Sequence, residues 1–313
     1  MSQNPPSFGQ SGSSGAAHSA PVCPRHPQVA SYVRCRRCDR PMCGACQVHT
    51  EVGAICTDCA GGLQRDRAAA QPRNAIGGRG SDTPIITWTL IGICVVMFGL
   101  QNLPGVSGVI RQWTTFAPFR TEAMPWTLIT SGFLHGGIMH LLLNMYALWA
   151  IGQFLERSLG RWRYLGLFLL SVIGGHAAVM WLASAGLDDW YTGTVGASGG
   201  VFGLFGALFV VQRRMGEQAT QVLVLIGLNF AFSFMYPDIS WQGHLGGMIT
   251  GTLIALVLFA TRVKATPGAD RAALARRADL THAAVLAAAL AVLGAVVLAR
   301  VLTVPDWAMP PLF

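Results

Sequence analysis

The sequence predicts an all-α polytopic membrane protein with a small cysteine-rich domain ahead of its first membrane span. Hydrophobic residues make up 52% of its 313 residues and charged residues only 12%, a balance that is not typical of soluble globular proteins. Seven apolar segments approach the roughly 20 residues of helix that cross the hydrocarbon core of a bilayer. Seven of the eight cysteines lie between residues 23 and 59. The chain therefore divides into a polar N-terminal part and a helical membrane part.

The seven expected spans follow one another from about residue 84 to about residue 303. No apolar run precedes them in this sequence, so we expect no removable signal peptide. The spans are expected near 84–103, 136–155, 162–184, 196–212, 219–236, 242–261 and 281–303.

Basic residues near the span ends predict the orientation, because Lys and Arg are retained on the cytoplasmic side. With a cytoplasmic N-terminus and an outer C-terminus, the outer loops hold only Arg111 and Arg120, and Arg300 lies near the outer end of the last span. The net charge of +8 then reflects topology, and we expect no nucleic-acid partner. The prediction is a multi-pass protein of the plasma (inner) membrane. The short cytoplasmic loops hold Arg157, Arg161, Arg163, Arg213, Arg214, Arg262, Lys264, Arg271, Arg276 and Arg277.

Changes in composition predict the domain boundaries. Residues 1–20 are rich in Ser, Gly, Gln and Pro without periodicity, and residues 61–83 resemble them with added Arg. Such composition predicts a disordered tail and a flexible linker. The cysteine-rich domain then covers 21–60, the membrane domain 84–303, and a C-terminal tail 304–313.

The cysteine-rich segment has the spacing of a zinc-binding domain. Eight ligands are enough for two tetrahedral zinc ions, and a segment this short needs such ions because it cannot form a sufficient hydrophobic core. A disulfide framework is the alternative, but the predicted topology puts the segment in the reducing cytosol. Cys94 lies within the first span, where we expect a packing residue. The ligand pairs are Cys23-x-x-His26, Cys35-x-x-Cys38, Cys43-x-x-Cys46 and Cys56-x-x-Cys59.

The order of these pairs resembles that of B-box and RING-like cross-braced fingers, in which the first and third pairs share one ion and the second and fourth share the other. His49, at the spacing Cys46-x-x-His49, can replace one ligand. Four protein ligands leave no open coordination position, so a docking or regulatory module for a cytoplasmic protein partner is expected in preference to a catalytic zinc. The resemblance implies one site of Cys23, His26, Cys43 and Cys46, and a second of Cys35, Cys38, Cys56 and Cys59.

A few polar side chains lie inside the apolar spans, where such groups are costly and commonly mark functional sites. His140 and Asn144 in the second span are four residues apart, so both project from one face of a helix. Ser198 opens the fourth span and His244 lies a few residues into the sixth, at similar expected depths below the outer surface. These four residues are the candidates for chemistry.

Glycines allow the fourth and sixth spans to approach closely, because small residues permit tight packing of membrane helices. Such packing brings Ser198 within hydrogen-bond reach of His244, so that the imidazole removes the hydroxyl proton as the serine attacks a carbonyl. Phe202, four residues after Ser198, is expected to stack on the imidazole. The alternative is a serine bonded to a preceding backbone carbonyl and a histidine that only packs. The glycines are Gly199, Gly200, Gly203, Gly206, Gly243, Gly247 and Gly251.

Three segments, "HGGIMHLLLN", "GASG" and "GHLGG", resemble the signature motifs of rhomboid intramembrane serine proteases over roughly residues 84–303. The resemblance implies a rhomboid-like bundle of six core transmembrane helices, with a seventh at the C-terminus. It implies that Ser198 is the nucleophile, that His244 is the general base and later the acid, and that no cofactor takes part in catalysis. His140, the Asn144 amide and the backbone N–H of Ser198 would hold the oxyanion. The implied substrates are transmembrane helices in the lipid bilayer, cut near the outer face.

Two features of the second motif region need separate interpretation. Rhomboids typically have a Trp-Arg pair before the second span, whereas here Trp126 is followed by Thr127. Because that position belongs to the scaffold, we expect activity to survive the difference. His135 matches a motif histidine and is interpreted as structural or water-organising. His176 matches no motif and is expected to pack or to form hydrogen bonds within the bundle.

Three alternatives from other classes remain open at this point. A catalytically silent rhomboid-like protein that binds membrane clients would be expected to lack Ser198 or His244, and both are present. A transporter would be expected to carry internal repeats, broken spans at corresponding positions or acidic residues within its spans. Apart from Glu156 at a cytoplasmic boundary, no acidic residue lies inside an expected span. A zinc-finger scaffold with a membrane anchor would leave the polar cluster unexplained.

Overall fold

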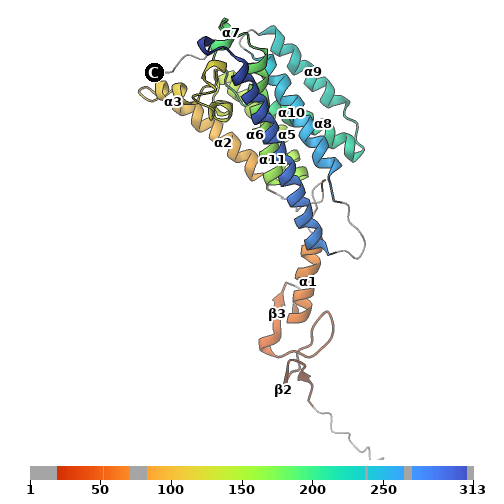
Figure 1. The fold of residues 1–313 in the computed structure, drawn as a ribbon. Coiled ribbons are helices and arrows are strands. Elements are labelled where there is room, and N and C mark those ends of the chain that lie inside the picture. Colours follow the sequence, from red (N-terminus) through yellow and green to blue (C-terminus); the bar gives the residue numbers. More distant parts are fainter. Residues whose placement is uncertain are drawn as a thin grey trace, which may run out of the picture. The chain divides into compact units, whose positions relative to one another are not determined.

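The computed structural model describes residues 20–51, 53–70, 76, 83–236, 239–263 and 270–308. The expected disordered tail lies outside the described residues except for Ala20, as does most of the linker between 71 and 82. The chain divides into two compact units, residues 1–71 and 72–313, which are treated separately below (Figure 1).

The N-terminal unit consists of two short antiparallel hairpins followed by a helix. In the second hairpin the pairing runs in register from Gln47 opposite Cys56 to Thr50 opposite Gly53. Its buried core is made mostly of cysteines, joined by Met42 and Ile55. So little apolar area cannot stabilise a fold by itself. The elements are β1 (Val22–Cys23), β2 (His26–Ala30), η1 (Gly44–Cys46), β3 (Gln47–Thr50), β4 (Gly53–Cys56) and α1 (Thr57–Ala70).

Helix α1 differs from the flexible linker that composition predicts, because residues 61–70 are helical. Ala60 and Leu63 pack against the cysteine core, which fixes the first turns of the helix. Asp58 lies in the first turn, where a negative charge favours the positive end of the helix dipole, and it pairs with Arg25 at 2.5 Å. Tertiary packing therefore extends the domain past its last cysteine.

The described part of the C-terminal unit is a bundle in which seven long helices overlap the seven expected spans. Among the described helices, α5, α6, α10 and α11 are long and apolar enough to cross a membrane. Helices α2 and α9 are apolar but have 16 residues each, about 24 Å of helix. The helices are α2 (Ile85–Leu100), α3 (Ser107–Thr114), α4 (Thr127–Thr130), α5 (Ile138–Leu159), α6 (Arg161–Leu182), α7 (Asp188–Tyr191), α8 (Ser198–Met215), α9 (Thr220–Met235), α10 (Trp241–Ala260) and α11 (Arg271–Thr303), with short 3₁₀ turns η2 (Pro118–Arg120), η3 (Ser131–Phe133) and η4 (Asp306–Ala308).

Helices α6, α8 and α10 form the centre of this bundle and pack on one another (Figure 1). Glycines make the packing close: Gly247 and Gly251 of α10 face the backbone of Gly199 and Gly203 of α8. Helix α5 packs against α2 and α8, α11 packs against α6, and α9 contacts α8 and α10. Five of the seven glycines singled out from sequence lie at the α8–α10 contact, whereas Gly200 faces Phe168 and Gly243 faces Val179, both on α6.

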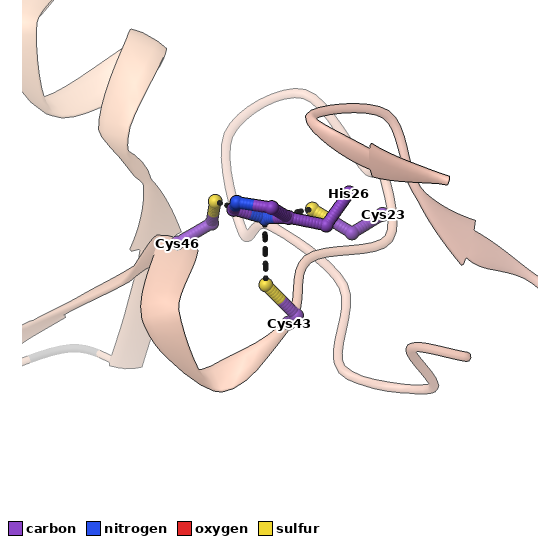
Figure 2. A group of neighbouring side chains, drawn as sticks. All are labelled: Cys23, His26, Cys43 and Cys46. Atoms are coloured by element: carbon purple, nitrogen blue, oxygen red, sulfur yellow. Dashed lines mark hydrogen bonds between the residues drawn. The ribbon is translucent and has the colours of Figure 1, made fainter. Parts of the chain in front are cut away.

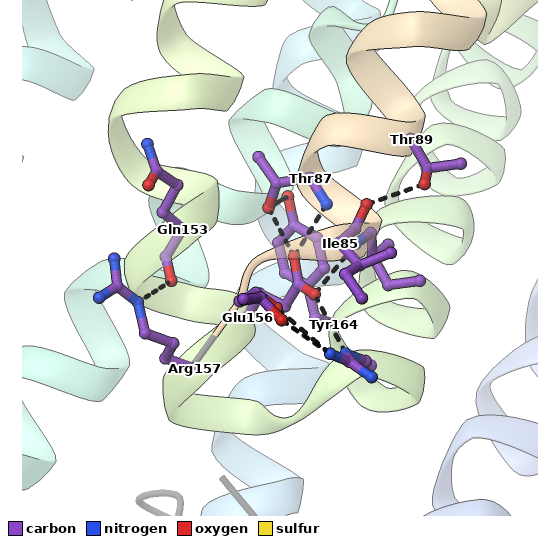
Figure 3. Close-up of polar contacts among 10 residues, drawn as sticks. Ile85, Thr87, Thr89, Gln153, Glu156, Arg157 and Tyr164 are labelled. Atoms are coloured by element: carbon purple, nitrogen blue, oxygen red, sulfur yellow. Dashed lines mark hydrogen bonds and ion pairs between the residues drawn. The ribbon is translucent and has the colours of Figure 1, made fainter. Parts of the chain in front are cut away.

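A buried carboxylate caps helix α2 (Figure 3). Glu156, near the end of α5, has no exposed side-chain surface and accepts hydrogen bonds from the backbone N–H groups of Ile86 at 3.0 Å and Thr87 at 2.8 Å. The Thr87 hydroxyl donates to the same carboxylate at 2.8 Å. Pro84 before the helix has no side-chain acceptor, so Glu156 supplies the cap from a neighbouring helix.

The last helix and the tail differ from the expected boundaries. Helix α11 begins at Arg271, well before the span expected near 281, and Asp270 caps it by accepting from the Ala272 N–H at 2.8 Å. Residues 304–308 do not extend away as a tail, because the carbonyl of Ala308 accepts a hydrogen bond from the Trp190 indole at 2.7 Å. Residues 309–313 lie outside the described residues.

An ion pair joins α11 to α6. The guanidinium of Arg163 is buried, donates to His282 Nδ1 at 2.8 Å and pairs with Asp279 at 2.5 Å. Hydrogen bonds that involve charged groups contribute about 1.5–3 kcal/mol each. These contacts hold the additional seventh helix on the bundle through Asp279, which hydropathy placed just outside the span, and His282, which lies just inside it.

Candidate catalytic site and metal sites

Ser198 is the first residue of α8 and is half-buried. The chain enters the helix through Gly196, whose φ of +133° is a conformation that favours glycine. The Gly196 N–H donates to the Ser131 carbonyl at 3.0 Å, which anchors this turn to the loop before α5. Since the first N–H groups of a helix have no intrahelical acceptor, the start of α8 offers donors beside the serine hydroxyl.

His244 lies in the first turn of α10, where it is 7% exposed. Its imidazole stacks on Phe202 of α8, with ring centroids 4.0 Å apart and planes inclined by 14°. This is the stacking expected from the spacing of Phe202 and Ser198. The imidazole Nδ1 lies 2.7 Å from the hydroxyl of Ser233 on α9. Three helices therefore meet around the His244 ring.

Backbone contacts set the separation of α8 and α10 beside these two residues. A methyl group at Gly247 would lie 2.9 Å from the Gly199 Cα of α8. A methyl group at Gly175 of α6 would lie 2.7 Å from the Gly243 carbonyl oxygen, so α6 also packs on α10 at this level. Gly199 follows Ser198 and Gly243 precedes His244 in the chain. The two predicted dyad residues thus each neighbour a glycine at the closest packing of the bundle.

His140 of α5 lies close to Ser198. A Cβ at Gly196 would lie 2.8 Å from His140 Nε2 and 3.5 Å from Ser198 Oγ, so the imidazole and the hydroxyl both border this glycine. His140 Nδ1 accepts from the Gly136 N–H at 3.4 Å. A neutral ring that accepts at Nδ1 carries its proton on Nε2, the atom nearer Gly196. His140 is thereby arranged as a donor toward the space beside Ser198.

Asn144 and His135 have more limited contacts. Asn144 is buried one turn after His140, and its amide donates to the His140 carbonyl at 2.8 Å, which leaves the second amide hydrogen for another acceptor. His135 is fully buried, and neither ring nitrogen has a hydrogen-bond partner among the described residues. Its ring meets the His140 ring edge-on at 5.2 Å. The side-chain amide of Gln101 holds the backbone of His135: its oxygen accepts from the His135 N–H at 3.0 Å, and its nitrogen donates to the His135 carbonyl at 2.5 Å.

His176 is a structural residue, in agreement with its predicted role. The buried ring lies 3.1 Å from the Ser131 hydroxyl through Nε2 and 2.9 Å from the Leu128 carbonyl through Nδ1. It also packs on Phe116, with ring centroids 4.6 Å apart. Both nitrogens are used, so His176 fastens the loop before α5 to α6.

The segment that lacks the expected arginine is held by other contacts. Thr127 is fully buried, its hydroxyl donates to the Met124 carbonyl at 2.6 Å, and its own carbonyl accepts from Ser131 at 2.7 Å. The Trp126 indole donates to the Trp113 carbonyl at 2.8 Å, and the two indoles stack. Local hydrogen bonds thus stabilise this loop with threonine, in place of arginine, at residue 127.

Sequence reasoning missed two polar residues that support the site. Ser233 contacts His244, and Gln101 holds the backbone of His135. Ser233 was detectable as a hydroxyl inside an apolar span, but serines commonly bond to their own helix, so its partner was not predictable. Gln101 lies at the end of its helix, where polar residues are ordinary.

The cysteine-rich unit brings together the same two sets of four ligands that the finger resemblance implies. Figure 2 shows the side chains of the first set converging. His26 Nδ1 lies 3.2 Å from Cys43 Sγ, 3.4 Å from Cys46 Sγ and 3.9 Å from Cys23 Sγ. Tetrahedral zinc with ordinary bond lengths separates sulfur and nitrogen ligands by about 3.6 Å. The first set therefore fits one zinc ion.

The second set is Cys35, Cys38, Cys56 and Cys59, whose ligand atoms lie within 4.8 Å of one another. Cys38 Sγ and Cys56 Sγ are 3.8 Å apart, which matches the spacing of about 3.8 Å between two sulfurs on one zinc and far exceeds a disulfide bond of about 2.05 Å. The eight cysteines, all in the described part of the chain, are free thiols. His49 is exposed on β3 and belongs to neither set.

Within each set, the neighbouring thiols and backbone groups change the pKa of the cysteines. A backbone hydrogen bond from Cys43 lowers the pKa of Cys23 to about 6, so this thiol ionises readily. Burial and the neighbouring thiols of Cys23 and Cys43 raise the pKa of Cys46 to about 11. In the second set, contacts with the thiols of Cys56 and Cys38 raise the pKa of Cys59 to about 12. A divalent cation would relieve this repulsion, because thiolates are the ligand form.

Comparisons with known proteins agree with the fold of the membrane unit. A family model described as the Rhomboid domain matches residues 122–261. The chain is 33% identical over 184 residues to the rhomboid protease GluP of Bacillus subtilis, covering 56% of this chain and 35% of that protein. It is 34% identical over 181 residues to the rhomboid homologue YdcA of the same organism, covering 56% of this chain and 88% of that protein.

A relative from yeast, the mitochondrial Rhomboid protein 1 of Saccharomyces cerevisiae, is 27% identical over 180 residues, which are 54% of this chain and 51% of that protein. The chain spans less than half the length of several of the relatives it matches. The matched domain includes the predicted residues His140, Asn144, Ser198 and His244.

Proposed function

Because this chain belongs to the rhomboid family, we propose that it is an intramembrane serine endopeptidase that cleaves other transmembrane proteins. It is a multi-pass membrane protein. The observation that carries the proposal is the stacking of His244 on Phe202, one turn after Ser198, at the closest backbone contact between α8 and α10. The stacking holds the imidazole beside the helix that Ser198 begins, which supports nucleophilic catalysis, although the contacts of the described residues include no hydrogen bond between Ser198 and His244.

In the proposed reaction Ser198 Oγ attacks the carbonyl carbon of the scissile peptide bond, and its proton moves to His244 Nε2. When the tetrahedral intermediate collapses, the same proton passes to the leaving amine. Water then attacks the acyl-enzyme with His244 again as the base, which releases the acid product and restores the serine. The two residues account for every proton transferred, and the reaction needs no metal or organic cofactor.

The oxyanion would be held by donors from two helices. His140 Nε2 and Ser198 Oγ border the same space beside Gly196, the Ser198 N–H lies at the start of α8, and Asn144 supplies an amide one turn along α5. Removing one such donor from a serine hydrolase costs about 2.7–4 kcal/mol of transition-state stabilisation. The helical substrate must unwind to reach Ser198, so small or helix-breaking residues near the cut are the expected preference.

The N-terminal unit would serve as a cytoplasmic docking or regulatory module for a protein partner. Two zinc ions held by the two ligand sets would supply folding free energy, since the unit has little apolar core. The positive-inside rule orients the protein with this module in the cytoplasm, the C-terminus outside and the cleavage site near the outer face of the plasma (inner) membrane.

The test is labelling of the purified protein by a fluorophosphonate, which reacts with activated serines, together with cleavage of a transmembrane substrate in proteoliposomes. We expect wild type to react in both assays and Ser198→Ala and His244→Ala to lose both. Ser158→Ala, which removes a hydroxyl elsewhere in the bundle, is the control. A folded wild type that neither labels nor cleaves, yet retains membrane proteins, would favour the catalytically silent client-binding alternative.

A further inference from the structure

Helix α9 touches the bundle through few residues, and one of them is a serine. Of the sixteen residues of α9, only Val222 and Ser233 are buried. Phe230 is partly buried and meets the edge of Phe202, the ring on which His244 stacks, at 5.1 Å. Ser233 thus places a hydroxyl against the predicted catalytic imidazole at a position where an apolar residue would satisfy packing.

The Ser233 hydroxyl has two acceptors within reach, and the one that takes its hydrogen sets the tautomer of His244. Its hydroxyl donates its single hydrogen to the Asn229 carbonyl at 2.9 Å, and its oxygen lies 2.7 Å from His244 Nδ1. When that hydrogen goes to Asn229, the serine oxygen accepts from the ring and Nδ1 carries a hydrogen; donation to Nδ1 instead would place the ring hydrogen on Nε2. A neutral imidazole protonated on Nδ1 has a free lone pair on Nε2. That lone pair is what a general base requires.

We propose that Ser233 is a positioning residue that holds His244 in its Nδ1-protonated form and fixes the orientation of the ring. The proposal rests on the protease function proposed above. Phe202 fixes the plane of the ring by stacking, and Ser233 fixes its rotation within that plane. Helix α9 therefore contributes to the chemistry although it carries neither member of the dyad.

The same contact becomes stronger during the reaction. When His244 takes the proton of Ser198, both ring nitrogens carry hydrogens and the ring is positively charged. A hydrogen bond from a charged donor is roughly twice as strong as one from a neutral donor. Ser233 thus stabilises the imidazolium. This matters because no carboxylate contacts His244 among the described residues. Loss of the additional strength that this bond gains in the charged state corresponds to about a tenfold lower kcat.

The first test measures the tautomer directly and does not depend on cleavage. Nitrogen NMR of ¹⁵N-histidine-labelled full-length protein in lipid distinguishes protonated from bare ring nitrogens, and comparison with His244→Gln assigns the signal. We expect Nδ1 of His244 to be protonated in wild type and Nε2 to be bare. A wild-type ring protonated on Nε2 would overturn the proposal, whether or not the protein proves to be a protease.

The second test separates positioning from folding by kinetics on a transmembrane substrate. Ser233→Ala is expected to lower kcat about tenfold and to change KM by less than about twofold, and Ser233→Thr, which restores the hydroxyl, is expected to recover most of kcat. Ser158→Ala is the matched control, because Ser158 is a buried helical serine whose hydroxyl donates to the Phe154 carbonyl at 2.8 Å. It should leave kcat unchanged.

Melting temperatures of the variants show that each is folded. A folded Ser233→Ala with wild-type kcat, or a folded Ser233→Thr as slow as Ser233→Ala, would contradict the positioning role. Failure of the protease proposal has a different signature, because wild type and Ser198→Ala would then cleave equally. In that event the NMR result still decides the role of Ser233.

Discussion

Replacing Gly247 of α10 with alanine tests whether the α8–α10 contact sets the catalytic geometry. The added methyl carbon would overlap the Gly199 carbonyl oxygen and would lie 2.7 Å from its carbonyl carbon and 2.9 Å from its Cα. All of these are backbone atoms, so no side chain can rotate away. The two helices must separate where Ser198 and His244 adjoin them.

The size of the displacement follows from ordinary contact distances. Carbon atoms in contact are about 3.5–4.0 Å apart, so the Cβ–Cα distance of 2.9 Å must grow by about 1 Å. A misplacement of about 1 Å in a reacting pair can lower the rate about 100-fold. Overpacking of this kind also costs about 1–3 kcal/mol of folding free energy. We therefore expect Gly247→Ala to lose cleavage far more than stability.

Cleavage rates in proteoliposomes and melting temperatures measure the two effects separately. Gly251→Ala is the matched variant, because its methyl group would meet the Gly203 backbone one turn farther from His244. It should lose similar stability and less activity. Gly92→Ala on α2 has no atom within 4 Å of the added carbon and should change neither. Wild-type cleavage by a folded Gly247→Ala would refute the link between this contact and catalysis.

Two further predictions concern the metal sites and the α2 cap. The full-length protein should hold two zinc equivalents, measured by elemental analysis. Cys43→Ser and Cys56→Ser should each lower the zinc content by about one equivalent, while His49→Ala should leave it unchanged. An unchanged content in either cysteine variant would contradict the two ligand sets. Glu156→Gln should lower the unfolding free energy by about 1–2 kcal/mol, because the buried carboxylate that accepts three hydrogen bonds loses its charge. A melting temperature equal to that of wild type would refute the capping role.

Hydropathy and spacing predicted the parts of the fold that depend on local sequence. A helix must be apolar to cross a membrane, so the seven long helices were visible as apolar runs. The glycines at the α8–α10 contact and the stacking of Phe202 on His244 followed from helical periodicity. Helix α1, which lies partly in the expected linker, and the early start of α11 did not, because both helices run through polar sequence and are fixed by tertiary contacts.

Polar contacts between helices were the part that the sequence did not predict. Glu156 was noted only as a boundary residue, yet it caps a helix that begins about 70 residues earlier in the chain. Ser233 gave no signal that distinguished it from a serine bonded to its own helix. In both cases the residue type permits the contact, but only the folded bundle brings the partner within reach.

The proposed roles of His140 and His244 require opposite hydrogen positions on two chemically identical rings. Each ring makes its protein hydrogen bond through Nδ1, so the partner at that atom determines the role of Nε2. Gly136 presents an N–H to His140, which leaves the ring hydrogen on Nε2 and makes it a donor suited to an oxyanion. In the proposed arrangement Ser233 accepts from His244 Nδ1, which leaves Nε2 bare and makes it a base. The backbone of the loop before α5 and one hydroxyl on α9 are then sufficient to assign the acid–base roles of the site.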